Sequence, residues 1–183
     1  MDDDMPLDPR RIAAVVYDDG VAVDDLLLAF VRELLDAGVP LGGVLHVPRG
    51  PAGCGPKAPM QLRDVATGEV FPICHDRGHG GDDCCLDPAK LRHAADRIRA
   101  ATQSAVDLIL VSRFGKEEAR GKGFRDELAR AVLSGRPVLT AVRRGLVDNW
   151  FSFTDGIGTV LDARLWVLRD WWGELRRTSR VAA

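Results

Sequence analysis

The sequence predicts an α/β fold of three layers, in which helices cover both faces of a mostly parallel sheet that carries an inserted β-hairpin. Two observations predict this class. Short, continuous apolar runs rich in β-branched residues recur along the chain, as is typical of parallel strands buried on both faces. Segments with apolar residues at helical spacing separate these runs. With 183 residues, of which 46% are hydrophobic and 28% charged, the chain has the size and composition of one globular domain.

The first fifty residues predict a strand, a helix and a second strand. The first strand is IAAVVY (12–17), and the segment DDLLLAFVRELLDAG that follows has helical periodicity. Asp24 is the expected N-cap of this helix and Gly38 its C-terminal stop. The segment PLGGVLHV (40–47) is the second strand. Together they predict a βαβ unit with a right-handed crossover.

The middle of the chain interrupts this alternation. The segments MQLRDV and EVFPIC flank ATG and predict a hairpin, with Pro72 placing the second strand at a sheet edge. Loops rich in glycine, or in glycine and proline, are expected on either side, at 49–59 and 74–85. The pair Asp87-Pro88 then predicts the start of a helix, because aspartate caps a helix well and proline fits its first position.

The alternation resumes in the second half. DLILVS (107–112) predicts a buried strand, RDELARAVLSG a helix with a glycine stop, and PVLTAV (137–142) a further strand. A short helix at about 146–153 and a strand in GTVL come next. The last segment predicts an amphipathic helix that packs onto the sheet through a stripe of apolar residues, namely Leu165, Trp166, Leu168, Trp171, Trp172 and Leu175.

These elements predict a single α/β domain over residues 11–177, between a disordered acidic tail (1–10) and a C-terminal tail (178–183). The N-terminal segment lacks the apolar run of a signal peptide, and no stretch has the ~20 apolar residues of a membrane span. We therefore expect a cytoplasmic protein without membrane insertion. The net charge of −2 and the absence of a basic stripe argue against nucleic acid as a partner.

In open α/β sheets, ligands bind beyond the carboxyl ends of the strands, so the loop after the first strand is a candidate site. Its sequence, YDDGVAVDD, lacks the lysine and the Ser or Thr of a phosphate-binding loop and has four aspartates instead. Backbone amides at the following helix could still bind an anion. Asp18, Asp19 and Gly20 are the candidate residues of this loop.

The loop after DLILVS is the second candidate and is cationic in character. Arg113 and Lys116 directly follow the strand, together with Ser112 and Gly115, and can direct N–H donors at an oxyanion. The cations further along, from residue 120 to 125, are better explained as a solvated charged loop.

The blocks DLILVSRFGKEEARGKGFRDELARAVLSGRPVLTAV, IAAVVYDDG and CCLDP together resemble an uncharacterised bacterial family often encoded near molybdate-transport genes. That family is in turn similar to the thermophile-type nucleoside-triphosphatases, which have a P-loop fold. The resemblance extends from Ile12 to about Trp172, and is strongest in residues 107–142. It implies a P-loop-like fold for this chain.

The resemblance also implies a loss of activity. In the nucleoside-triphosphatases, the strand equivalent to DLILVS ends in an Asp-Glu pair that holds magnesium, followed by a Gly-Lys step. Ser112 and Arg113 stand at the Asp-Glu positions here, whereas Gly115 and Lys116 match the Gly-Lys step. Arginine in place of a carboxylate reverses the local charge, which favours a bare anion. Molybdate or tungstate would suit both this charge and the family's genomic context.

The stretch CHDRGHGGDDCC (74–85) is a third candidate, because thiolates and imidazoles together suit zinc or another transition metal. No C-x2-C pair is present, so the pattern is not that of a zinc finger. Two buried free thiols explain the residues equally well. A nucleophilic cysteine is the third explanation, because the nearby aspartates oppose the lowered thiol pKa that it needs. The resemblance implies that only the cysteines at 54 and 85 follow the family pattern. The candidate metal ligands are Cys54, Cys74, His75, His79, Cys84 and Cys85.

We therefore expect a small cytoplasmic protein that binds an oxyanion or a metal ion and has a regulatory role, for which molybdate or tungstate handling is the proposed context. A nucleotide-binding protein or NTPase with an atypical phosphate loop is the first alternative. A transition-metal protein that uses the Cys/His-rich loop is the second. The loss of both NTPase motifs argues against an enzyme, and the sequence leaves a homo-oligomer open.

Overall fold

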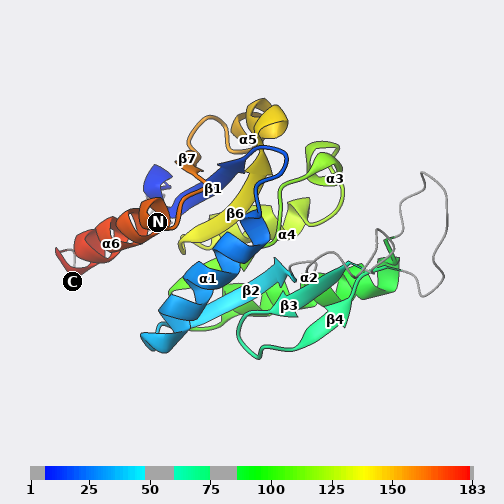
Figure 1. Ribbon diagram of the computed structural model, residues 1–183, viewed down its shortest axis with the longest axis horizontal. Coiled ribbons are helices and arrows are strands. Elements are labelled where there is room, and N and C mark those ends of the chain that lie inside the picture. The colour runs from blue at the N-terminus through cyan, green and yellow to red at the C-terminus, as the bar shows by residue number, and fades with distance from the viewer. Residues whose placement is uncertain (1–6, 48–59, 75–85, 182–183) are drawn as a thin grey trace, which may run out of the picture.

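The computed structural model describes residues 7–47, 60–74 and 86–181 of the chain (Figure 1). In these residues, seven strands form one sheet in the order β4-β3-β2-β5-β6-β1-β7. The strands are β1 (Ile12–Tyr17), β2 (Leu41–His46), β3 (Gln61–Asp64), β4 (Val70–Pro72), β5 (Leu108–Val111), β6 (Val138–Arg143) and β7 (Thr159–Asp162). The helices are α1 (Val23–Asp36), α2 (Pro88–Gln103), α3 (Lys116–Ala119), α4 (Arg125–Leu133), α5 (Val147–Phe153) and α6 (Leu165–Val181), with short 3-10 turns at Pro9–Arg11 and Arg144–Leu146.

The sheet is mostly parallel, as predicted. Parallel pairs join β2 to β5, β5 to β6, β6 to β1 and β1 to β7. The hairpin β3–β4 is added antiparallel to β2. Its second strand, which contains Pro72, lies at the outer edge of the sheet, where a residue without an N–H is tolerated. The strands β1 and β2 of the predicted βαβ unit are not neighbours, because β5 and β6 lie between them.

Helices cover both faces of the sheet and complete three layers (Figure 1). Alternate residues of β1 illustrate the packing, since Ala13 and Val15 join the apolar cluster beneath α1 and α6, whereas Ile12 and Ala14 join the cluster beneath α2, α4 and α5. A strand buried on both faces must be apolar throughout, which explains the unbroken run IAAVVY.

Two other local signals act as the sequence predicts. The Asp87 carboxylate accepts from the backbone N–H of Ala89 at 2.8 Å and so caps α2, whose first residue is Pro88. Gly38 follows α1 with a φ of +73°, the left-handed conformation that ends many helices.

Several boundaries differ from the expectations. Helix α1 begins at Val23 after Ala22, so Asp24 lies inside the first turn and is not the N-cap. Helix α6 runs to Val181 and so includes most of the segment that we expected as a C-terminal tail. Trp166 is 57% exposed and does not belong to the buried stripe of α6, because it faces away from the sheet that its neighbours cover.

Strand β2 passes very close to β5 at one point. Gly43 has a φ of +98°, and a Cβ atom added there would lie 1.9 Å from the carbonyl oxygen of Leu110. Only glycine permits both this backbone conformation and this approach. The second half of β2, with His46 at its end, is therefore held close beside β5.

Candidate functional site

The carboxyl ends of the parallel strands meet at one edge of the sheet, and most of the predicted anion-site residues lie there. The loop Asp18–Gly20 follows β1, and Ser112 and Arg113 follow β5. Between β5 and β1 lies β6, which ends in Arg143 and is followed by Arg144. Neighbouring strands are about 4.8 Å apart, so these loops are adjacent. We call this the carboxyl edge.

Arg113 is held by a carboxylate from helix α1. Its Nε donates to Asp24 Oδ1 at 3.2 Å and its Nη2 to Asp24 Oδ2 at 2.5 Å, a two-point contact. The side chains of Arg113 and Asp24 are 33% and 19% exposed. The guanidinium also lies 5.5 Å from the ring centre of Tyr17, within the range of a cation–π contact. The predicted anion donor is thus engaged by an aspartate in the first turn of α1 and is not bare.

The two arginines at the end of β6 hold the aspartates of the loop after β1. Arg144 donates from Nε to Asp18 Oδ1 at 2.7 Å and from Nη2 to Asp18 Oδ2 at 3.0 Å. Arg143 Nη1 lies 3.0 Å from Asp19 Oδ1. The hydrogen bonds from Arg144 hold the pKa of Asp18 below its usual value, and the same contact raises the pKa of Arg144.

The loop after β1 forms a tight turn rather than an open phosphate cradle. The N–H of Val21 donates to the carbonyl of Asp18 at 3.2 Å, and Gly20 has a φ of +87°. Asp24 and Asp25 both lie in the first turn of α1, where the partial positive charge of a helix N-terminus favours carboxylates. Carboxylates therefore lie where a phosphate-binding loop would bind its anion, at the N-terminus of the helix.

Ser112 is buried beside the end of β2. Its side chain is hydrogen-bonded to His46 Nδ1, and the residue is 1% exposed. It therefore contributes to the packing of the carboxyl edge and has no surface at which to meet a ligand.

Gly115 is the N-cap of helix α3 and Lys116 its first residue, and a buried carboxylate holds the two ends of this segment together. Glu118, 7% exposed, accepts from the N–H of Gly115 at 2.9 Å through Oε2 and from the N–H of Phe124 at 2.9 Å through Oε1. We call this arrangement the Glu118 ring. Lys116 is exposed, and in the described part of the chain it makes no ion pair or hydrogen bond through its side chain. Among the described residues, Lys116 therefore has no anionic partner at the carboxyl edge.

A small cavity of about 240 Å³ opens at the same edge, between the ends of β1 and β7. The paired side chains of Asp18 and Arg144 form part of its wall, and Asp162 forms another. The cavity is therefore walled by both signs of charge.

The predicted metal ligands cannot be assembled in the same way. Cys54, His75, His79, Cys84 and Cys85 lie outside the described residues. Cys74 is a buried free thiol whose backbone forms an antiparallel bridge with Leu86, and Lys90 Nζ donates to its backbone carbonyl at 2.8 Å. Among the residues that the structure describes, no three His, Cys, Asp or Glu side chains are grouped as metal ligands.

The sequence reasoning missed three residues of this edge. Arg143 and Arg144 are absent from the predicted site, although an RR pair directly after an apolar run is the same signal that predicts Arg113. The sequence predicts Asp24 as a helix cap, whereas its carboxylate binds Arg113.

The comparisons with known proteins agree with this fold. The sequence pattern of the family described as "Protein of unknown function (DUF2478)" matches residues 12–171. A protein of Bradyrhizobium diazoefficiens named molybdenum import ATP-binding protein ModC 2 is 42% identical over 168 residues. The 168 matched residues cover 91% of this chain and only 18% of that protein, so the chain corresponds to a small part of its relative.

Among solved structures, that of a human cancer-related nucleoside triphosphatase is similar, with a TM-score of 0.56 and 17% identity over 82% of this chain and 88% of the other. At this identity the likeness shows the fold alone, and it confirms the predicted P-loop-like α/β architecture. None of the helices within residues 7–47, 60–74 and 86–181 has the length and apolar content that a bilayer crossing requires.

Proposed function

The chain belongs to the DUF2478 family, and on that premise we propose that it is a binding or regulatory protein for a small oxyanion, molybdate or tungstate, and does not hydrolyse nucleotides. The observation that carries the proposal is the two-point contact between Arg113 and Asp24 at the first turn of α1. A helix N-terminus beside an arginine is suited to an anion, and in this structure an internal carboxylate takes that role.

In this proposal, the oxyanion replaces Asp24 on the guanidinium of Arg113. Molybdate and tungstate are tetrahedral dianions that present only hydrogen-bond acceptors, as a carboxylate does, but with twice its charge. Arginine presents N–H groups in a rigid fork that suits two oxygens of such an ion. Lys116, exposed and unpaired among the described residues, supplies a second cation from the same loop. Release of Asp24 would link occupancy to the start of α1, which is the proposed basis of a regulatory role.

The donor set argues against hydrolysis of a magnesium-bound triphosphate. Such a reaction needs carboxylates that can hold the metal ion. Asp18, Asp19 and Asp24 each have an arginine partner. Ser112 is buried against His46 at the position where the resemblance places a carboxylate.

The name of the 42%-identical relative supports the molybdenum context. Because that protein is much longer, its printed function does not pass directly to this chain. It does suggest that a domain of this kind works beside an ATP-binding protein of molybdenum import, and this is the partner that we propose. The cytoplasmic location expected from the sequence would follow from such a partnership.

Calorimetric titration of the purified full chain with molybdate, tungstate, sulfate and magnesium-ATP tests the proposal. We expect molybdate and tungstate to bind at one site, and Arg113→Ala to weaken both by about tenfold or more, the size of a lost charged hydrogen bond. Arg169→Ala is the matched control, because Arg169 makes a similar two-point contact with Glu33 on the exposed face of α1. Clean binding of magnesium-ATP, with no heat from any oxyanion, would overturn the proposal.

Binding of magnesium-ATP without any oxyanion would instead favour the second candidate, a nucleotide-binding protein with an atypical phosphate loop. The P-loop-like fold is the observation that supports this candidate. The transition-metal alternative depends on the stretch 74–85, nearly all of which lies outside the described residues. Elemental analysis of untagged protein, compared with a Cys84→Ser/Cys85→Ser variant, tests it independently of the oxyanion titration.

A further inference from the structure

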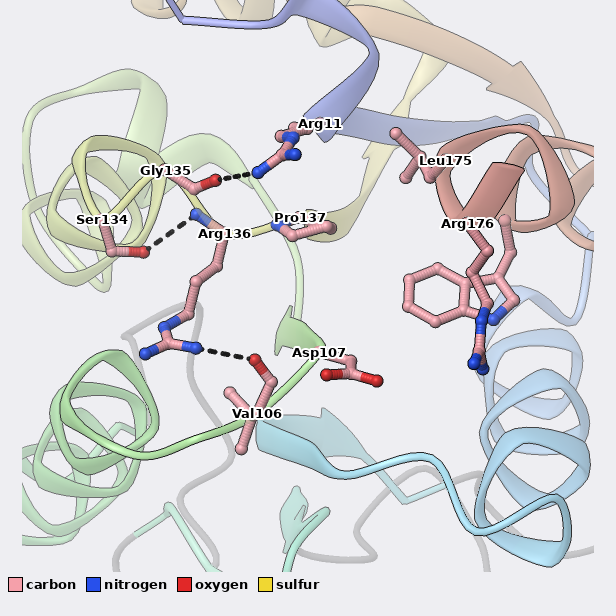
Figure 2. A pocket seen from close by; sticks show the side chains of 10 residues that line it. Arg11, Val106, Asp107, Ser134, Gly135, Arg136, Pro137, Leu175 and Arg176 are labelled. Atoms are coloured by element: carbon pink, nitrogen blue, oxygen red, sulfur yellow. Dashed lines mark hydrogen bonds between the residues drawn. The ribbon is translucent and has the colours of Figure 1, made fainter. Parts of the chain in front are cut away.

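The opposite edge of the sheet, at the amino ends of the strands, has a larger hollow with a different charge pattern. This hollow measures about 420 Å³. Its polar wall is formed by Arg11 just before β1, Asp107 just before β5 and Arg136 just before β6, and helix α6 adds Arg176 (Figure 2). Because β5, β6 and β1 are neighbours in the sheet, side chains that precede three neighbouring strands line the same hollow.

Two of the arginines are fixed in place by neutral partners. Arg11 Nη1 donates to the carbonyl oxygen of Gly135 at 2.9 Å, and Arg136 Nη1 donates to that of Val106 at 2.8 Å (Figure 2). A guanidinium has five N–H donors, so each keeps others for a ligand. A carbonyl orients the side chain without cancelling its positive charge. Both cations are therefore positioned in advance.

Carboxylates do little to neutralise these arginines. Among the described residues, the carboxylate oxygen nearest to Arg11 is Asp8 Oδ2, 4.0 Å from Nε. In the described part of the chain, Arg136 and Arg176 have no carboxylate within 4.0 Å. Asp107 is the acidic residue of the wall, so three arginines face one carboxylate. At the carboxyl edge, by contrast, Arg113, Arg143 and Arg144 are each matched by an aspartate.

The rest of the wall is apolar and partly aromatic. Trp172 and Leu175 of α6 line one side of the hollow, and Val106 and Pro137 line it from the sheet. The guanidinium of Arg176 lies 6.0 Å from the centre of the Trp172 ring. A volume of this size, with an apolar wall and a few polar groups, is typical of small-molecule sites.

From this combination we propose that the amino edge binds a small organic anion, in which a carboxylate or a phosphate is attached to a planar or apolar body. The charged group takes the remaining N–H donors of Arg11 and Arg136. The body packs against Trp172 and Leu175. This site is separate from the carboxyl edge and does not depend on the oxyanion proposal.

Nuclear magnetic resonance of the full chain tests the proposal through the indole N–H of Trp172, identified by its loss in Trp172→Phe. The probes are phenyl phosphate, benzoate, inorganic phosphate and benzyl alcohol. We expect phenyl phosphate or benzoate to shift this resonance in a saturable way. Inorganic phosphate should bind about tenfold more weakly, because it lacks the body, and benzyl alcohol should not bind, because it lacks the charge.

Arg136→Gln should lower the affinity for phenyl phosphate or benzoate by about tenfold or more. Because Arg136 also donates to Val106, Arg176→Gln serves as a second variant that removes no protein hydrogen bond among the described residues, and it should weaken binding as well. Arg113→Ala at the carboxyl edge should leave the affinity unchanged. The proposal is overturned if neither aromatic anion shifts Trp172, if inorganic phosphate binds as tightly as phenyl phosphate, or if both variants bind like the wild type.

Discussion

The Asp24 carboxylate, in the first turn of α1, accepts two hydrogen bonds from the guanidinium of Arg113. Replacing this carboxylate by an amide therefore removes the group that would compete with an oxyanion for Arg113. Asp24→Asn keeps the size of the side chain and abolishes its charge. If the proposed function holds, this variant should be less stable than the wild type and yet bind molybdate more tightly. A purely structural ion pair would give the loss of stability without the gain of affinity.

The burial of the pair sets the expected magnitude. Exposed ion pairs contribute about 0.2–1 kcal/mol, whereas breaking a buried pair costs about 3–5 kcal/mol. With side chains 33% and 19% exposed, Arg113 and Asp24 lie between these limits. We expect a coupling of about 1–2 kcal/mol, which corresponds to roughly a five- to thirty-fold gain in molybdate affinity when Asp24 no longer competes.

Urea denaturation of the wild type, Asp24→Asn, Arg113→Ala and the double variant measures the coupling as a double-mutant cycle. Calorimetric titration with molybdate measures the affinity of the same four proteins. Asp25→Asn is the matched control, because Asp25 lies in the same helical turn, is exposed and makes no ion pair among the described residues. Weaker molybdate binding by Asp24→Asn, or a gain of equal size in Asp25→Asn, would refute the reasoning.

Three further predictions concern the framework of the two edges. Gly43→Ala should lower the free energy of unfolding, measured in urea, by about 3 kcal/mol or more, because the cost of a positive φ adds to a clash with Leu110. Gly68→Ala is the control, because Gly68 has a φ of +77° but open space around it, and it should lower this free energy by only about 1–2 kcal/mol. Equal losses in the two variants would contradict the close approach of β2 to β5. Glu118→Gln replaces one acceptor oxygen of the Glu118 ring by an N–H donor and should lower the free energy of unfolding by about 1–3 kcal/mol. Glu117→Gln is the control and should change this free energy little. The Asp18 carboxyl should titrate below the usual pKa of an aspartate, because Arg144 donates to it, and in Arg144→Ala its pKa should rise towards that usual value. Because the folded pKa is the lowered one, the stabilisation is present above the unfolded pKa and is lost as the pH falls through the folded pKa; a pKa unchanged by the substitution would show that Arg144 is not the cause.

The sequence predicted the elements well wherever local chemistry determines them. The pair Asp87-Pro88 begins α2, and the run that contains β5 is buried on both faces, since capping and apolar patterning involve neighbouring residues only. The hairpin with Pro72 at the sheet edge follows from the same kind of local signal.

The ion pairs of the carboxyl edge could not be predicted, because they depend on the order of the strands. Arg113 and Asp24 are 89 positions apart in the sequence, and Arg144 and Asp18 are 126 apart. Only the placement of β6 between β5 and β1 brings the arginines after β6 to the loop after β1. The sequence placed Arg113 at a strand end correctly, but it could not show which carboxylate it would meet there.

The pairing of β1 with β6 connects the two edges in one further way. Residues Ile12 to Tyr17 pair in parallel with Val138 to Arg143, without interruption. Arg11 and Arg136 precede these paired residues, and Arg143 and Arg144 end or follow them. A substitution that slipped β6 by one residue against β1 would therefore displace the arginines at both ends by the same step, about 3.3 Å. The two proposed sites share one strand register, so the buried side chains between them constrain the geometry of both.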